Sequence, residues 1–230
     1  MLGGKGMCGW LLAIAAVVLL SGCARQGGEA ESGRSNPTSS TAPSANSTET
    51  SETVTYTSTD GRPPLEEALK ELYTEADRRY QMMVYLIVDT TDETTETNFG
   101  SYHRVSDDRF ASLEELRTYL SACFTDRIVN TLLPADSAIW IEHDGKLFVL
   151  DSGKGVNPLY AGHVFRLISR DDSHIRLACT RYFAKEMADV PDRPFYEAPA
   201  DSEAFQTDTV NFEMVRTGDG WRFDVFSLLY

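Results

Sequence analysis

Hydrophobic and polar positions divide this chain into three parts. Residues 10–20 form a short apolar run that follows a single early positive charge at Lys5. Residues 25–62 are Ser, Thr, Gly, Asn and Glu, with almost no large apolar side chain before Val54. Beyond this stretch, apolar residues recur at regular spacings. The pattern predicts a leader, a disordered tether and one folded domain over residues 63–230.

The folded domain begins with helical periodicity. Pro63 and Pro64 are typical of a first helical turn, and Glu66 and Lys70 are spaced to pair across one turn. The apolar stripe predicts a helix that ends near Met83, and it consists of Leu65, Ala68, Leu69, Leu72, Ala76, Tyr80 and Met83. Residues 89–98 are polar and acidic and predict a loop, and residues 101–105 predict a short strand.

A second helical region follows. Ser112 and Glu115 have the spacing of a capping box, with serine at the N-cap and glutamate three residues later. A further helix start has Thr125 as its cap, and Pro134 ends it.

After Pro134 the period changes from helix to strand. Three pairs of alternating segments flank turn-forming residues, and they are 138–142 with 146–150, 163–169 with 174–183, and 209–216 with 221–229. Each pair predicts an antiparallel hairpin with one buried face. Residues 184–206 contain three prolines and predict an irregular surface segment.

Helices followed by sequential hairpins indicate an α+β fold, with N-terminal helices packed on a curved antiparallel sheet of about six strands. This order of elements resembles the nuclear-transport-factor-two-like fold, in which helices fill the concave side of a bent sheet.

The end of the apolar run carries a second resemblance. Leu20-Ser21-Gly22-Cys23 resembles the lipobox of bacterial lipoproteins. The resemblance implies cleavage after residue 22, lipidation of Cys23, and a tether over residues 23–62 that holds the domain outside the cell membrane. Two acyl chains anchor a protein stably where one does not. An uncleaved anchor or a plain signal peptide is the alternative, and either also places the domain outside the membrane.

The net charge limits the classes of molecule that we expect this chain to bind. The formal net charge is −14, and nearly all of it lies after Arg62. This excludes nucleic acid as the expected partner, because its binding needs Lys and Arg to displace counterions. It fits a basic protein partner, although solubility explains the acidic surface equally well.

The residues that carry chemistry are few. Cys123 and Cys179 each lie on the apolar side of their element, and we expect buried, unreactive thiols. The four histidines share no helical face and form no metal motif, and they are His103, His143, His163 and His174. We therefore expect no cofactor, no metal and no catalytic activity, although convergence of three histidines in space stays open.

Several short motifs in the middle of the domain resemble one family. They are Tyr-His-Arg-Val-Ser at 102–106, Leu-Arg-Thr-Tyr-Leu at 116–120, Phe-Thr-Asp at 124–126 and His-Asp-Gly-Lys-Leu at 143–147. Their order and spacing resemble the secreted inhibitors of bacterial DL-endopeptidases (IseA type). The resemblance implies a non-catalytic protein that blocks peptidoglycan-cutting cysteine peptidases of the NlpC type.

Three functional hypotheses follow. The first is an inhibitor whose working surface is a loop rim that contains Asp151, Lys154, Tyr160, Asp171 and Asp172. The second is a nuclear-transport-factor-two-like cone that binds a small ligand or carries simple acid–base chemistry, which predicts a deep pocket with at least one polar group of perturbed pKa. The third is a structural or sensory envelope component with neither pocket nor enzyme target.

Overall fold

The computed structural model of this chain describes residues 58–153 and 155–230. The predicted leader, Cys23, Lys154 and the first part of the predicted tether lie outside the described residues. Within the described parts, no helix combines the length and the apolar character needed to cross a bilayer.

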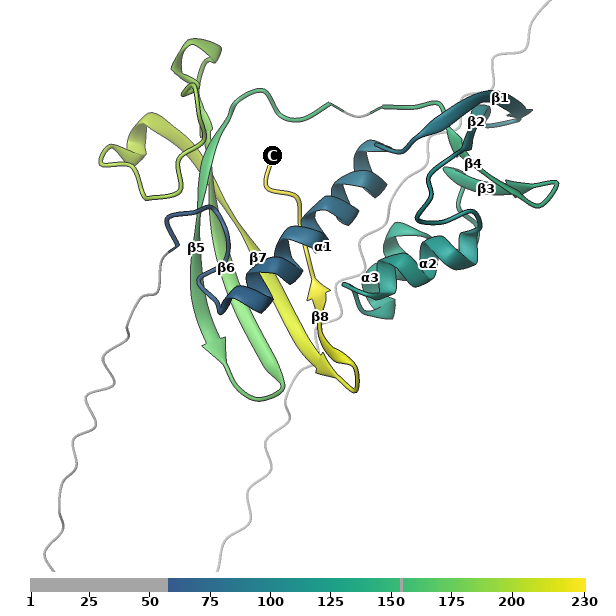
Figure 1. Cartoon of the computed structure of the whole chain (residues 1–230). Helices are drawn as coiled ribbons and strands as arrows, with labels where there is room; N and C mark the ends of the chain where they lie inside the picture. The colour runs from purple at the N-terminus through teal and green to yellow at the C-terminus, as the bar shows by residue number, and fades with distance from the viewer. Residues whose placement is uncertain (1–57, 154) are drawn as a thin grey trace, which may run out of the picture. The chain divides into compact units, whose positions relative to one another are not determined.

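The described residues form an α+β fold of two antiparallel four-stranded sheets with helices packed between and beside them (Figure 1). The helices are α1 (Glu67–Tyr85), α2 (Leu113–Ser121) and α3 (Asp126–Leu132), with short 3₁₀ turns η1 (Met187–Asp189) and η2 (Ser202–Ala204). The strands are β1 (Thr90–Thr97), β2 (Gly100–Val105), β3 (Trp140–His143), β4 (Lys146–Leu150), β5 (Tyr160–Arg170), β6 (His174–Ala184), β7 (Phe205–Thr217) and β8 (Gly220–Val225). The predicted single sheet of about six strands is therefore corrected to two separate sheets.

The first sheet has the order β1-β2-β4-β3. The β3–β4 hairpin forms at Asp144 and Gly145, as predicted, and both turn residues have a positive φ (51° and 71°). One pairing in this sheet joins strands that are far apart in the sequence. Strand β2 pairs with β4, although both short helices lie between them in the chain, and Tyr102 is opposite Leu150.

Strand β1 corrects a second prediction, because its sequence predicts a loop. The strand is Thr-rich and acidic, and most of its side chains are exposed. It lies at the edge of the sheet and pairs only with β2. Threonine favours extended backbone because its side chain branches at Cβ, whereas the absence of a buried face removes the apolar alternation by which strands are recognised.

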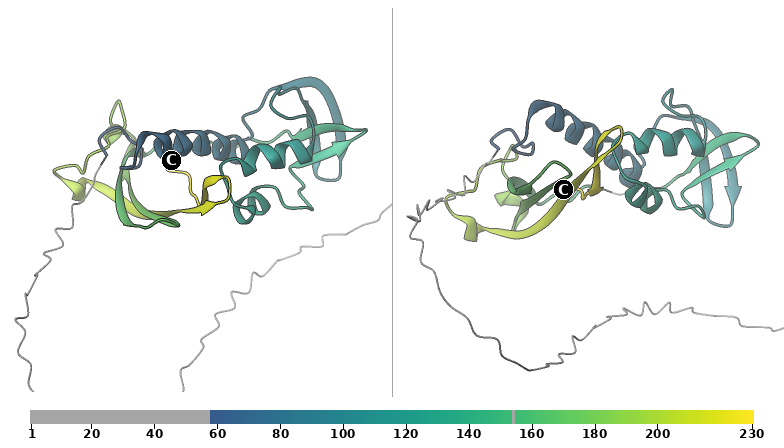
Figure 2. Two further views of the ribbon diagram at one scale, coloured as in Figure 1. Left: turned by 60° about the horizontal axis from the view of Figure 1, so that its bottom comes forward. Right: turned by 90° about the horizontal axis from the view of Figure 1, so that it is seen from below.

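The second sheet has the order β5-β6-β7-β8, and its two hairpins lie where the alternation predicts them. Helix α1 lies along one face of this sheet, whose strands curve beneath it (Figure 2). The buried residues of that face alternate along the strands as predicted, and they are Phe165, Ile175, Leu177, Cys179, Phe212, Met214 and Phe223.

The two short helices connect the sheets. The Ser112 side chain caps α2 by accepting a hydrogen bond from the Glu115 backbone N–H at 3.1 Å, as predicted. Thr125 precedes α3 but does not cap it with its side chain, because its hydroxyl donates to Asp224 at 2.6 Å. Backbone bonds from Thr125 N–H to the Phe223 carbonyl (2.9 Å) and from Phe223 N–H to the Cys123 carbonyl (2.8 Å) fasten this connection to β8.

The irregular segment 185–204 docks against the free edge of β5. The Phe195 carbonyl accepts a hydrogen bond from His163 N–H at 3.0 Å, and Phe195 N–H donates to the Ala161 carbonyl at 3.1 Å. Gly162, between these two residues, permits the contact, since a Cβ there would lie 2.2 Å from the Phe195 carbonyl oxygen. The contact covers a strand edge that would otherwise be free to pair with another chain.

We predict that Gly162→Ala lowers the free energy of unfolding by about 1–3 kcal/mol, because overpacking against fixed backbone forces a local shift. Urea denaturation measures the effect. Gly218→Ala is the matched control, because nothing lies within 4 Å of the added Cβ at that turn. Equal stability of the two variants would show that the segment does not hold the β5 edge.

Candidate functional site

A pocket of about 660 Å³ opens between α1, the start of β5 and three irregular segments. These segments are residues 60–62 ahead of α1, residues 156–158 ahead of β5, and residues 194–196, with the C-terminal residues 229–230 closing the lining. The aromatic side chains that line it are Tyr73, Tyr160, His163, Tyr196 and Tyr230, and the other polar ones are Asp60, Arg62, Thr74, Asp77 and Asn157. We call this cavity the α1 pocket.

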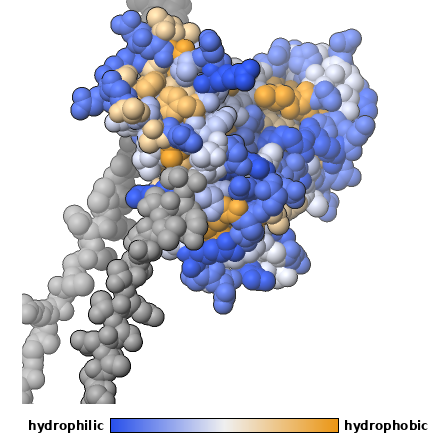
Figure 3. All heavy atoms as spheres, turned by 60° about the vertical axis from the view of Figure 1, so that its left-hand side comes forward, coloured by the Kyte–Doolittle hydropathy of each residue, from blue (hydrophilic) through white to orange (hydrophobic). Residues whose placement is uncertain are grey.

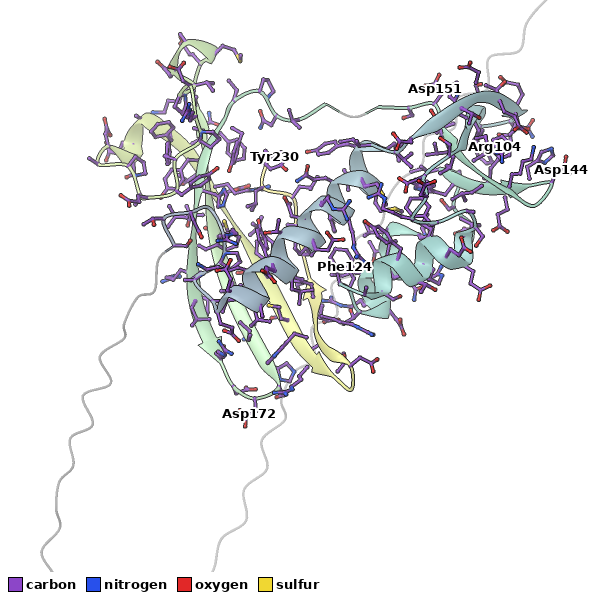
Figure 4. The ribbon with its side chains drawn as sticks, viewed as in Figure 1. Arg104, Phe124, Asp144, Asp151, Asp172 and Tyr230 are labelled. Atoms are coloured by element: carbon purple, nitrogen blue, oxygen red, sulfur yellow. The ribbon has the colours of Figure 1, made fainter. Side chains whose placement is uncertain are left out.

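Aromatic rings form much of the wall of the α1 pocket. The Tyr160 and Tyr230 ring centroids are 5.5 Å apart, and the His163 and Tyr196 centroids are 5.2 Å apart. The Tyr85 hydroxyl donates to the Tyr230 backbone oxygen at 2.8 Å, which positions the C-terminal residues against α1. Figure 4 shows Tyr230 in this place, between the second sheet and the helix.

Asp77 is the most unusual group in the pocket. Its Oδ2 accepts a hydrogen bond from the Gln81 side chain at 2.6 Å, whereas its Oδ1 is buried and has no hydrogen-bond partner among the described residues. Burial raises the pKa of Asp77 to about 6, against the lowering effect of the Gln81 hydrogen bond. A buried acceptor left without a donor costs about 1–3 kcal/mol, so this carboxylate destabilises the empty fold.

His163 is buried, and both of its ring nitrogens have partners. Its Nε2 lies 2.7 Å from the Gly61 carbonyl, and its Nδ1 is hydrogen-bonded to the Tyr160 hydroxyl. A carbonyl can only accept, so Nε2 carries the proton and Nδ1 accepts from Tyr160. Burial lowers the pKa of His163, although the Gly61 hydrogen bond opposes the shift, and the ring is neutral at physiological pH.

The Gly61 contact attaches residues 58–62 to the domain, ahead of the predicted boundary at residue 63. Gly61 has a φ of 74°, and a Cβ there would lie 2.7 Å from the Tyr196 ring. Asp60 forms ion pairs with Arg62 at 2.9 Å and with Lys70 at 3.4 Å. The last residues of the predicted tether therefore form one wall of the α1 pocket.

The structure does not bring the predicted partner-binding residues to one rim. Asp151 and Asp172 lie at opposite ends of the described fold (Figure 4). Asp171 accepts the backbone N–H bonds of Ser173 and His174, at 2.8 Å each, within its own turn. Tyr160 is half-buried on the wall of the α1 pocket, where its ring centroid lies 5.5 Å from that of Tyr230. The expectation of a shared rim is therefore wrong, whereas a contact of each residue with a partner stays a prediction.

The two cysteines of the described fold are buried and free, as predicted. Burial raises the pKa of Cys123 to about 11 and that of Cys179 further, so neither thiol ionises at neutral pH. His103 Nε2, on β2 of the first sheet, lies 3.5 Å from Asp151 Oδ2, whereas His163 is on β5 of the second sheet. Across residues 58–153 and 155–230, no three potential metal ligands cluster.

No protein-family model matches the sequence, and no curated protein matches it. On the face that Figure 3 shows, hydrophobic side chains occur in separate groups among hydrophilic ones. We therefore infer the function of this chain from the geometry and chemistry of the α1 pocket.

Asp77 is not among the site residues that the sequence predicts. One feature of the pattern indicates it, because Asp77 is one turn beyond buried Tyr73 and next to buried Ala76. An acidic residue at the border of an apolar stripe is close to the buried side of its helix. Tyr196 and Tyr230 join it from distant parts of the chain, and no local pattern indicates that meeting.

We predict that Asp77→Asn stabilises the fold by about 2 kcal/mol at pH 7.5. The folded-state pKa of about 6 exceeds the ordinary value of 3.8, so the carboxyl group disfavours the folded state increasingly as pH rises from 4 through 6. The gain should therefore disappear near pH 4.

Urea denaturation at the two pH values measures this gain. Glu71→Gln, at an exposed carboxylate on the same helix, is the control and should change little at either pH. A neutral or destabilising effect of Asp77→Asn at pH 7.5 would mean that the Asp77 charge is compensated in the fold.

Proposed function

We propose that this chain is an extracytoplasmic, membrane-anchored lipoprotein whose folded domain binds a small ligand in the α1 pocket. The anchor rests on the sequence alone, through the apolar run and Cys23. The ligand-binding role rests on one observation, which is a buried, unpartnered carboxylate oxygen in an aromatic-walled pocket.

The dimensions and lining of the α1 pocket support this role. Small-molecule sites are concave, occupy about 300–1,000 Å³, and combine an apolar wall with a few polar groups that orient the ligand. The α1 pocket has about 660 Å³, several aromatic walls and one unsatisfied acceptor. A pocket on the curved side of the second sheet also supports the resemblance to nuclear-transport-factor-two-like domains.

Binding accounts for this chemistry better than catalysis does. A general acid–base site needs a positioned partner for its titrating group. Asp77 is hydrogen-bonded only to Gln81 among the described side chains, and both nitrogens of His163 already have partners. The cysteines are buried and protonated. We therefore propose a domain that holds its ligand without transforming it.

We predict that filling the pocket abolishes binding. A small-molecule library tested on the whole chain by thermal shift should yield ligands that raise Tm, because a ligand that binds only the folded state stabilises it. Thr74→Trp places an indole in the pocket wall and should remove the shift.

Glu71→Trp, on the exposed face of the same helix, should retain the shift. If every active compound stabilises Thr74→Trp as much as the unmodified chain, the α1 pocket is not the binding site.

A second candidate function, restraint of a peptidoglycan DL-endopeptidase of NlpC type, is favoured by the tip of the β1–β2 hairpin. Phe99 at this tip is 72% exposed, and two acidic side chains on β1 are exposed, with Glu96 near the tip and Asp92 towards the other end of the strand. Aromatic anchors carry much of the binding energy at interfaces, and acidic groups around them suit a basic groove. The hairpin thus fits the predicted inhibitor better than the dispersed rim residues do.

We predict that Phe99→Ser weakens inhibition of such an endopeptidase at least about tenfold, as expected for loss of an interface anchor. Hydrolysis of purified cell wall by the host's enzymes measures inhibition. Met187→Ser is the control, because Met187 is similarly exposed (62%) on the segment between β6 and β7. Equal inhibition by both variants, or none by the unmodified chain, would reject this candidate.

A further inference from the structure

We infer that the occupant of the α1 pocket is a small organic cation, which places an ammonium nitrogen beside Asp77 and among the surrounding tyrosine rings. This inference rests on the small-ligand function proposed above and specifies the chemical class of the ligand. It is carried by the balance of charges on the pocket wall and by the aromatic rings.

The basic side chains near the pocket are already paired. Arg62 contacts Asp60 at 2.9 Å and Glu67 at 2.8 Å, and Lys70 contacts Asp60 at 3.4 Å. These two positive and two negative groups cancel one another. Asp77 adds one negative charge, and no ion pair joins it to any described Lys, Arg or His side chain. The pocket therefore lacks one positive charge.

Tyrosines from several elements line the pocket with Asp77, and they include Tyr73 on α1, Tyr160 on β5 and Tyr230. After burial, the Asp77 charge contributes to raising the pKa values of four tyrosines, which are Tyr73, Tyr85, Tyr160 and Tyr230. None of these hydroxyls donates to Asp77 Oδ1, which has no hydrogen-bond partner among residues 58–153 and 155–230. Cations bind favourably over the faces of aromatic rings, by about 0.5–2 kcal/mol each, and most strongly where water is excluded. One carboxylate among several aromatic rings is a suitable environment for an ammonium group.

The other ligand classes satisfy the pocket less well. An anion would be repelled by Asp77, since the neighbouring cations are already neutralised. A neutral hydroxyl would satisfy Oδ1 but would leave the charge buried and uncompensated. A metal ion such as Ca²⁺ takes six or more oxygen ligands, whereas no cluster of potential metal ligands occurs in the described fold. An organic cation alone satisfies both the unpaired charge and the aromatic walls.

The inference also fixes the direction of the pH dependence. The cation binds the ionised form of Asp77, so affinity should fall as pH drops through about 6. Gln81 donates to Asp77, and the other charged or titratable groups that line the pocket are Asp60, Arg62, Tyr73, Tyr160, His163, Tyr196 and Tyr230. Burial lowers the pKa of His163, so this ring also titrates on the acid side. A pH effect that disappears in Asp77→Asn therefore belongs to Asp77.

A pair of isosteres tests the inference. Choline carries a trimethylammonium group, and 3,3-dimethylbutan-1-ol has the same shape with carbon in place of nitrogen. Butylamine and butan-1-ol, in which a hydroxyl replaces the ammonium group on the same carbon chain, form a second pair for primary ammonium groups. Ligand-observed NMR and thermal shift with the whole chain should use probes at about 10 mM, above the millimolar Kd typical of fragments.

At pH 7.5 we expect at least one cation to bind tenfold or more tightly than its neutral isostere, and we expect this preference to shrink at pH 5. Asp77→Asn should remove the preference, and Glu71→Gln should retain it. Thr74→Trp should weaken the binding of every probe, which would place the binding site in the α1 pocket without altering the Asp77 carboxylate.

The other outcomes separate the two proposals. If both members of each pair bind equally and Thr74→Trp weakens them all, the inferred ligand class is wrong and the small-ligand function stands. If no cationic probe binds, the inferred class is again overturned, and the library screen with Thr74→Trp decides the function. If only a lysine-containing peptide binds in the pocket, the occupant is a protein side chain and both proposals fail.

Discussion

The packing of α1 against the curved side of the second sheet holds this domain together. Tyr73 lies at its centre, with its ring within 5.3–6.3 Å of four phenylalanine rings. These are Phe165, Phe212, Phe223 and Phe226, from β5, β7, β8 and the segment after β8. Edge-to-face contacts of this kind add stability beyond the apolar area that they bury. One helix turn thus joins elements that are far apart in the sequence.

The same helix carries the group that opposes this stability. Asp77 lies one turn beyond Tyr73, and both residues line the α1 pocket. The strong packing on one side of the turn tolerates an unsatisfied carboxylate on the other. Such local compromise is typical of binding sites, where a group is arranged for its ligand and not for the empty fold.

Much of the secondary structure follows from local pattern. The alternation around Phe212 and Phe223 gives the last hairpin, and the spacing of Ser112 and Glu115 gives the start of α2. Strand β1 could not be predicted from the sequence because it has no buried face. The division into two sheets could not be predicted because β2 pairs with β4, and two helices separate these strands in the chain. The residues of the α1 pocket could not be predicted for a related reason. They come from five separate segments of the chain, and only the complete topology brings these segments together.

The hydrogen bond from His163 to Gly61 has a mechanical consequence. Residues 60–62 are part of the pocket wall, and they lie in the first portion of the described chain. A force applied to the chain ahead of Ser58 would therefore reach Gly61 and Arg62 before it reached α1. If the chain is tethered at Cys23, tension in the tether would act first on the wall of the binding site, and the grip on an occupant would then depend on the pull from the membrane.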